Sequence, residues 1–316
     1  MSSIKCESFH EFEESYKTVN DCEIKASLFV PKQISKKVLP ILVHFHGGGL
    51  VMGDKNYFPW WATWLVQLAE KHEAVIVSPN YRLIPEATVS DVLQDLESFW
   101  TWLPEYLPSQ VRMKFGNVRL DMQNILVAGE SAGGYLALQS AFLYPDAGIS
   151  AAICQYGTML FNPEFVLKPC TEEEAEIVPE QLVDEHLQSI KPGAVRSSSV
   201  GDDALRLSAA FVQHGRYDGF LGENPYIFLE AAEKYAAVVP PIWLIQGTED
   251  STVSLWHMFI TKQVLTAKGA GRIVPSAHRL FEPTYTADKS MLQSRTRRPW
   301  IRPSSDTEHG VGEGGS

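Results

Sequence analysis

Long apolar runs are missing from this chain. No stretch approaches the roughly 18 consecutive apolar residues that a membrane-spanning helix needs. The first 20 residues carry Glu and Lys without an apolar run, so they do not have the pattern of a signal peptide. The sequence therefore predicts neither a membrane span nor export through such a leader.

The chain has few cysteines, and none of them are spaced as a pair in the sequence. The four cysteines, Cys6, Cys22, Cys154 and Cys170, form no CxxC motif. Such a set is typical of scattered free thiols in a reducing compartment. A cytoplasmic location is the corresponding expectation.

Positive charge is outweighed by negative charge. The chain has 27 Lys and Arg against 38 Asp and Glu, a formal net charge of -11. An acidic protein is repelled by nucleic acid and by anionic membrane surfaces, so neither is expected as a partner. Nothing in the sequence indicates an oligomeric state.

Short β-rich apolar runs alternate with longer helical patterns along the 316 residues. Strands are predicted at 14–19, 23–30, 39–45, 73–78, 124–128, 149–155 and 241–246, with the short run 272–274 as the final strand. Helices are predicted at 59–71, 89–103, 132–143 and 225–236. This alternation predicts an α/β fold, with a mostly parallel sheet flanked by helices.

One domain spanning residues 1–316 is predicted, because large α/β folds often reach this length as a single unit. Residues 159–222 break the alternation and are expected to form a cap-like insertion over one end of the sheet, with a helix near 203–214. Residues 292–316 are rich in Arg, Ser, Pro and Gly with little apolar periodicity. This tail is predicted to be disordered or weakly packed.

The strongest local motif is Gly129-Glu130-Ser131-Ala132-Gly133-Gly134, between a predicted strand and a predicted helix. The pattern G-x-S-x-G in that context predicts a sharp turn that projects the serine hydroxyl. The helix N-terminus behind it offers N–H groups to a developing negative charge. Ser131 is thus the candidate nucleophile, and a glycine-rich turn with a merely capping serine is the alternative.

A second motif, His46-Gly47-Gly48-Gly49, directly follows the predicted strand 39–45. Three consecutive glycines let the backbone turn so that its N–H groups can face a reacting oxygen from the side opposite Ser131. Backbone amides are suitable oxyanion donors, because they are fixed before the reaction begins. The two motifs together are far more specific than either alone.

A catalytic serine needs a base and an acid that orients the base, and these follow it in the order serine, acid, histidine in this architecture. Asp250 directly follows the strand 241–246, where such sheets present functional groups, and its competitor is the neighbouring Glu249. His278 is preferred as the base because its spacing from Asp250 fits one helix, one strand and a loop. His309 in the tail is the alternative, whereas His257 is too close to the acid in sequence.

Two further patterns have competing interpretations. His44 and His46 would lie on one strand face, but no further zinc ligands with suitable spacing appear, so no metal site is predicted. The aromatic residues in Tyr57-Phe58-Pro59-Trp60-Trp61 could line an acyl pocket, although such clusters are more often part of the core.

These motifs resemble those of the hormone-sensitive-lipase-like family of α/β-hydrolases, which includes carboxylesterases. The resemblance extends from about Glu14 to Phe281, and Asn80-Tyr81-Arg82-Leu83-Ile84-Pro85-Glu86 is similar to a mainly structural stretch of the family. It implies Ser131, Asp250 and His278 as a catalytic triad. It also implies an oxyanion hole formed by the backbones of Gly48, Gly49 and Ala132. The final strand looks shortened relative to the family, and no amphipathic helix is recognisable after His278.

The expected activity is hydrolysis of a small or medium acyl ester through an acyl-enzyme intermediate, with no metal or organic cofactor. The same triad could serve an amidase or a formamidase. A non-catalytic ligand-binding protein on this fold is a third possibility. Such proteins typically retain the serine region and lose the histidine, so the identity of the base bears on this choice.

Overall fold

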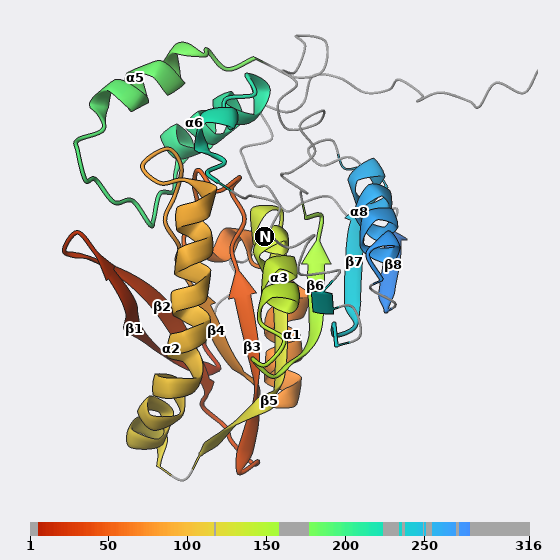
Figure 1. The fold of residues 1–316 in the computed structure, drawn as a ribbon. Helices are drawn as coiled ribbons and strands as arrows, with labels where there is room; N and C mark the ends of the chain where they lie inside the picture. The colour runs from red at the N-terminus through yellow and green to blue at the C-terminus, as the bar shows by residue number, and fades with distance from the viewer. Residues whose placement is uncertain are drawn as a thin grey trace, which may run out of the picture. The chain divides into compact units, whose positions relative to one another are not determined.

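In the computed structural model, the strands form one eight-stranded sheet in the order β1-β2-β4-β3-β5-β6-β7-β8 (Figure 1). The strands are β1 Phe9–Val19, β2 Cys22–Pro31, β3 Val38–Phe45, β4 Val75–Pro79, β5 Arg119–Glu130, β6 Ile149–Gln155, β7 Ile242–Gly247 and β8 Ile273–His278. β2 is antiparallel to both of its neighbours, and every pair from β4 to β8 is parallel.

The structure describes residues 6–116, 118–157, 177–223, 234–235, 238–248, 250, 255–269 and 272–278. All of them belong to one unit of the chain, Met1–Thr284. The helices are α1 Thr63–His72, α2 Val89–Phe115, α3 Ala132–Leu143, α5 Gln181–Ser189, α6 Asp202–Gln213 and α8 Leu255–Ala267, with short 3-10 turns η1 Phe58–Trp60 and η2 Asp218–Phe220. None of these helices is both long enough and apolar enough to cross a bilayer.

The alternation of strands and helices predicted from the sequence is confirmed, with differences in length. α3 and β6 have the predicted bounds, whereas α2 continues to Phe115 through Pro104 and Pro108. The predicted helix ends at 103, the residue before Pro104, and a proline inside a helix costs about 3 kcal/mol. Leu107 and Val111 beyond it are fully buried, and their packing against the core offsets that cost. The predicted tail 292–316 and most of the predicted helix 225–236 lie outside the described residues.

The sheet is covered on both faces because neighbouring residues of its central strands point to opposite sides. Val43 and Val77 join the apolar cluster formed with α2 and α3. Leu42 and Ile76 join a second cluster formed with α1. In Figure 1, α2 and α3 lie in front of the sheet and α1 behind it. This two-sided burial explains why the inner strands are continuous apolar runs.

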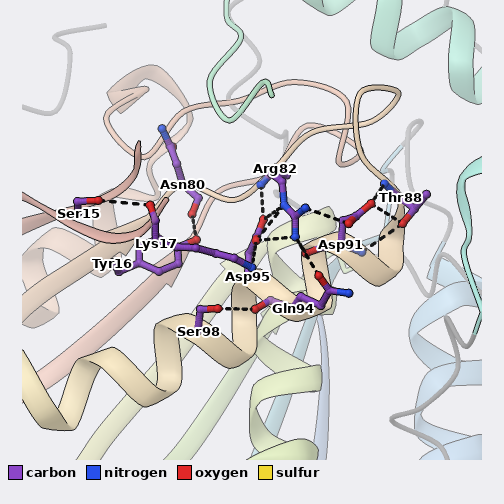
Figure 2. A network of polar contacts seen from close by, with 10 residues as sticks. All are labelled: Ser15, Tyr16, Lys17, Asn80, Arg82, Thr88, Asp91, Gln94, Asp95 and Ser98. Carbon is purple, nitrogen blue, oxygen red and sulfur yellow. Dashed lines mark hydrogen bonds and ion pairs between the residues drawn. The ribbon is translucent and has the colours of Figure 1, made fainter. Parts of the chain in front are cut away.

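A buried ionic network fixes the start of α2 to β1 and to the segment after β4 (Figure 2). Asp95 of α2 is fully buried and accepts hydrogen bonds from the backbone and guanidinium of Arg82, both at 2.9 Å. Lys17 of β1 approaches the same carboxylate at 2.7 Å. Thr88 and Asp91 form a capping box at the helix N-terminus, and Arg82 also bonds to Asp91. Arg82 therefore has the structural role that was expected of it.

The insertion contributes α5 and α6, which lie beyond the carboxyl ends of the central strands (Figure 1). Its connecting segment is attached to the body through Arg196, whose guanidinium bonds to Glu86 Oε2 at 2.8 Å, to Val51 O at 2.9 Å and to Ile84 O. Gly53 and Ser199 add a short antiparallel bridge. The helix predicted near 203–214 corresponds to α6. Residues 159–176 of the predicted insertion lie outside the described residues.

Candidate active site

Ser131 occupies the sharp turn between β5 and α3. Its backbone angles are φ 53° and ψ -120°, a region that residues other than glycine rarely occupy. The backbone N–H of Ser131 donates to the carbonyl of Gln155 on β6 at 3.0 Å, which anchors the turn to the neighbouring strand. A strained serine held in this way has the geometry expected of a nucleophile presented at the end of a strand.

The alternative of a capping serine is not supported. Ser131 occupies the N-cap position of α3, yet its side chain makes no capping hydrogen bond. The turn is also unusually tight: a Cβ added to Gly133 would collide with the carbonyl of Phe45 at the end of β3. The hydroxyl of Ser131 thus makes no capping hydrogen bond to the helix. The backbone of α3 packs directly against the start of the His46-Gly47-Gly48-Gly49 motif.

Strand pairing brings the two glycine motifs together. β3 and β5 are parallel neighbours, and Phe45 pairs with Gly129, so His46 and Glu130 follow at the same edge of the sheet. A Cβ added to Gly47 would lie 3.3 Å from the Cβ of Ser131. The loop predicted to supply oxyanion donors therefore lies directly beside the candidate nucleophile.

The loop after His46 has the conformation that its glycines permit. Gly48 and Gly49 have φ angles of 107° and 64°, and a side chain at either position would be strained. The carbonyl of Gly48 accepts hydrogen bonds from the backbone N–H groups of Val51 and Met52, each at 3.0 Å. This closed turn restrains the Gly48–Gly49 peptide, which belongs to the predicted oxyanion hole.

Asp250 follows β7 at the same edge of the sheet. Its Oδ2 accepts a hydrogen bond at 3.0 Å from the side chain of Gln246, which is almost fully buried in β7. That bond orients the carboxylate relative to the sheet. The competing acid, Glu249, lies outside the described residues.

The structure places the backbone of His278 at the last position of β8. His278 pairs with Gly247, so it lies beside the strand end from which Asp250 follows. Its side chain, like that of His257 on α8, is not among the described side chains, and His309 lies outside the described residues. The carboxyl ends of β5, β7 and β8 thus carry the three predicted triad positions in the expected order.

The two histidines considered as zinc ligands have other partners. His44 is fully buried, and its Nε2 lies 2.8 Å from Glu130 Oε2, directly beneath the serine turn. His46 stacks on the ring of Tyr81, and its Nδ1 lies 2.8 Å from the carbonyl of Gly47. Within the described part of the chain, no group of three or more His, Cys, Asp or Glu side chains has an arrangement that could hold a metal ion.

Protonation of His46 is disfavoured. Burial lowers the pKa of His46 to about 4, although the hydrogen bond to Gly47 acts in the opposite direction. The ring is therefore neutral near pH 7, and because a carbonyl can only accept, Nδ1 must carry the proton. His46 Nδ1 donates to Gly47 O, and this bond holds the peptide whose N–H belongs to Gly48.

Of the aromatic residues after the oxyanion loop, Trp61 belongs to the core. Its ring is fully buried and lies 4.7 Å from the His44 ring and 5.3 Å from Phe29, between centroids. Trp61 thus supports the His44–Glu130 pair from the α1 side. A cavity of about 360 Å³ lies elsewhere, among Asn20, Arg82, Glu86 and residues 190–196, and none of its lining residues is a predicted site residue.

Sequence reasoning missed the residues that contact the oxyanion loop from distant positions. Tyr217 and Ser208, both from the insertion, donate hydroxyl hydrogen bonds to loop carbonyls. Tyr81, from the stretch that resembles a mainly structural segment of the family, donates to the carbonyl of His46 at 2.7 Å. No local motif marks these residues, because each acts across a long separation in sequence.

Comparison with known proteins places this arrangement in a family. A family model described as alpha/beta hydrolase fold matches residues 42–251, a segment that contains both glycine motifs and Asp250. A probable carboxylesterase, M8, of Phoma sp. is 31% identical over 312 residues, covering 95% of each chain. Another, clz11, of Cochliobolus lunatus is 33% identical over 202 residues, covering 60% of this chain and 92% of its own.

Solved structures show the same fold. A thermostable esterase from Pseudomonas putida aligns with a TM-score of 0.56 at 18% identity, covering 92% of this chain and 81% of the esterase. The sheet order, the parallel strands and the flanking helices are therefore those of an α/β-hydrolase. The expected family resemblance is confirmed: the chain belongs to the α/β-hydrolase family.

Proposed function

We propose that Ser131 is the nucleophile of a carboxylesterase-type serine hydrolase. The single observation that carries this proposal is the strained turn at Ser131 with the loop of Gly47 directly against it. The chain is a carboxylic ester hydrolase by family, and its relatives in Phoma sp. and Cochliobolus lunatus are named probable carboxylesterases. The residue assignment is supported by the position of Asp250 just after β7 and of His278 at the last position of the neighbouring strand β8.

In the proposed reaction, His278 accepts the hydroxyl proton of Ser131 while the serine oxygen attacks the ester carbonyl carbon. Asp250 holds the imidazole in the productive tautomer and stabilises its positive charge. The proton then passes to the leaving alcohol oxygen as the ester C–O bond breaks, which leaves an acyl group on Ser131. Water, activated by the same histidine, releases the acid and restores the serine.

Negative charge on the tetrahedral oxygen is stabilised by backbone N–H groups of Gly48, Gly49 and Ala132. The first two come from the loop after β3, and the third is the first residue of α3. Each such donor contributes on the order of a hundredfold in rate, because it is already oriented when the charge develops. None of these steps calls for a metal or organic cofactor.

The proposed substrates are small or medium uncharged acyl esters. The test is hydrolysis of p-nitrophenyl esters of increasing acyl length by the full chain, beside Ser131→Ala, His278→Ala and His309→Ala. Activity that disappears in Ser131→Ala and His278→Ala but persists in His309→Ala supports the assignment. Activity that Ser131→Ala retains would refute the proposed nucleophile. If activity is lost in His309→Ala but kept in His278→Ala, the base is His309 instead of His278.

Matched amide substrates measure the leaving-group preference in the same assay. Faster turnover of an anilide than of the corresponding ester would overturn the esterase proposal in favour of an amidase. A folded wild type without turnover above Ser131→Ala would contradict hydrolysis of these esters, and it would favour a ligand-binding role instead.

A further inference from the structure

The insertion reaches the oxyanion loop through two buried hydroxyl groups. The side-chain hydroxyl of Tyr217 donates to the carbonyl oxygen of Gly49 at 2.8 Å. Ser208 on α6 donates to the carbonyl of Gly48 at 3.3 Å. Tyr217 is 1% exposed and Ser208 is 8% exposed, so neither bond competes with bulk water.

These bonds bear on the direction of the loop N–H groups. A trans peptide is planar, and its carbonyl and N–H point in opposite directions. A donor that holds the carbonyl of Gly48 therefore also fixes the N–H of Gly49, one of the proposed oxyanion donors. A donor that holds the carbonyl of Gly49 fixes the peptide between Gly49 and Leu50, so Gly49 is restrained at both of its peptide bonds.

The carbonyls of Gly48 and Gly49 differ in the other hydrogen bonds that they accept. The carbonyl of Gly48 also accepts from the backbone N–H groups of Val51 and Met52 at 3.0 Å, so it would remain hydrogen-bonded without Ser208. For the carbonyl of Gly49, Tyr217 is the donor that the described residues provide. A Cβ added to Gly49 would lie 2.7 Å from the Tyr217 hydroxyl, so the phenol also limits the space into which the loop could move.

Such restraint matters because a run of glycines has little conformational preference of its own. An oxyanion hole depends on donors that are oriented before the reaction, and a misplacement of about 1 Å can cost roughly a hundredfold in rate. Burial raises the pKa of Tyr217, which keeps the phenol protonated as a donor. The aromatic ring itself is packed against Phe211 of α6, with 5.7 Å between centroids.

We propose that Tyr217, with Ser208 as a weaker partner, is a positioning residue for the oxyanion loop, so that the insertion forms part of the catalytic apparatus. This inference rests on the proposed esterase function. It predicts that the insertion affects stabilisation of the tetrahedral state rather than only the shape of the substrate pocket.

The test compares Tyr217→Phe with Tyr16→Phe in the full chain, using p-nitrophenyl butyrate. Tyr16 is a matched control, because its buried hydroxyl also donates to a backbone carbonyl, that of Asn80, at 2.6 Å. Tyr217→Phe is expected to lower kcat roughly tenfold while KM stays within about twofold, since the restraint acts on the tetrahedral state. Ser208→Ala should lower kcat less, and Tyr16→Phe should leave it unchanged.

A second measurement separates positioning from simple loss of folded enzyme. The active fraction of each variant is counted by titration with a phosphonate that reacts with the nucleophile, and kcat is corrected for it. Inhibition by phenylboronic acid, which forms a tetrahedral adduct on a serine oxygen, should then weaken in Tyr217→Phe by about the same factor as kcat. Competitive inhibition by the planar product acid should change by less than about twofold.

Each outcome has a distinct meaning. If Ser131→Ala retains the wild-type activity, the proposed function fails and the role of Tyr217 fails with it. If Ser131→Ala is inactive while Tyr217→Phe matches Tyr16→Phe in corrected kcat and boronate inhibition, the positioning role alone is refuted. A parallel loss of kcat and boronate affinity, with KM and product inhibition retained, supports it.

Discussion

Glu130 Oε2 lies 2.8 Å from His44 Nε2 beneath the turn that presents Ser131. Both side chains are almost completely buried, at 8% exposure for Glu130 and 0% for His44. A carboxylate adjacent in sequence to a candidate nucleophile could be mistaken for a catalytic acid. Its bond to His44 instead links the serine turn on β5 to the neighbouring strand β3.

Replacement of Glu130 by Ala is therefore expected to destabilise the protein. It would leave the buried Nε2 of His44 without its partner, at a cost of about 2 kcal/mol or more. The measurement is the free energy of unfolding in urea. Glu130→Gln, which keeps an acceptor oxygen for His44, should lose less than half as much. Equal losses in the two variants would contradict the role of the hydrogen bond.

Substitution of Ser131 by glycine is expected to stabilise the fold relative to Ser131→Ala, although both variants lack the nucleophile. The φ of 53° and ψ of -120° strain any residue with a Cβ, whereas glycine adopts them freely. The expected difference in the free energy of unfolding is about 1 kcal/mol in favour of glycine. A glycine variant no more stable than the alanine variant would argue against strain at this turn.

His46 is expected to make the stability depend on pH. Burial lowers its pKa in the folded state to about 4, below the ordinary value of 6.5. Between these values the unfolded chain binds more protons than the folded chain, so the free energy of unfolding falls as the pH falls from 6.5 towards 4. The full contribution of the lowered His46 pKa to the free energy of unfolding is present above pH 6.5 and amounts to about 3 kcal/mol.

The measurement is urea denaturation at several pH values across that window, for the wild type and His46→Asn. Asparagine keeps an N–H donor for the carbonyl of Gly47 but cannot gain a proton. The variant should therefore show a flatter dependence on pH. If its slope equals that of the wild type, another group is responsible for the acid sensitivity.

Removal of the buried carboxylate of Asp95 is expected to be more damaging than any surface change on α2. Asp95→Ala would leave Arg82 and Lys17 without the acceptor that both contact in Figure 2, which costs about 3 kcal/mol or more. Ser98→Ala is the control one turn along the same helix, because Ser98 is only partly buried and its hydroxyl donates locally, to the carbonyl of Gln94. It should change the free energy of unfolding by less than about 0.5 kcal/mol. Similar thermal denaturation of the two variants would contradict the importance of the network.

The fold could be predicted from the sequence because its signals are local. Apolar strands such as 39–45 and 149–155 are continuous runs, and the serine turn is marked by Gly129-Glu130-Ser131-Ala132-Gly133. The family and the esterase class followed from these motifs, and the comparisons confirm them. The assignment of Ser131, Asp250 and His278 to a triad stays a prediction, as does a cytoplasmic location.

The long-range part of the site could not be predicted in the same way. Tyr217 contacts a glycine 168 positions earlier in the sequence, and nothing around it marks a site. The continuation of α2 past Pro104 was equally hidden, because it depends on the burial of Leu107 in a core assembled from other elements. Local patterns thus identify the chemistry, whereas tertiary packing determines which side chains orient it.

The attachment of Arg196 has a consequence for how substrates gain access. A hinged lid would have to separate this guanidinium from Glu86, Val51 and Ile84 in one movement. Hydrogen bonds to charged groups are worth about 1.5–3 kcal/mol each, so the open form would be rarer than roughly one molecule in a thousand. At this attachment the insertion is therefore fixed to the body of the fold, so the segment around Arg196 would not serve as the moving edge of a lid.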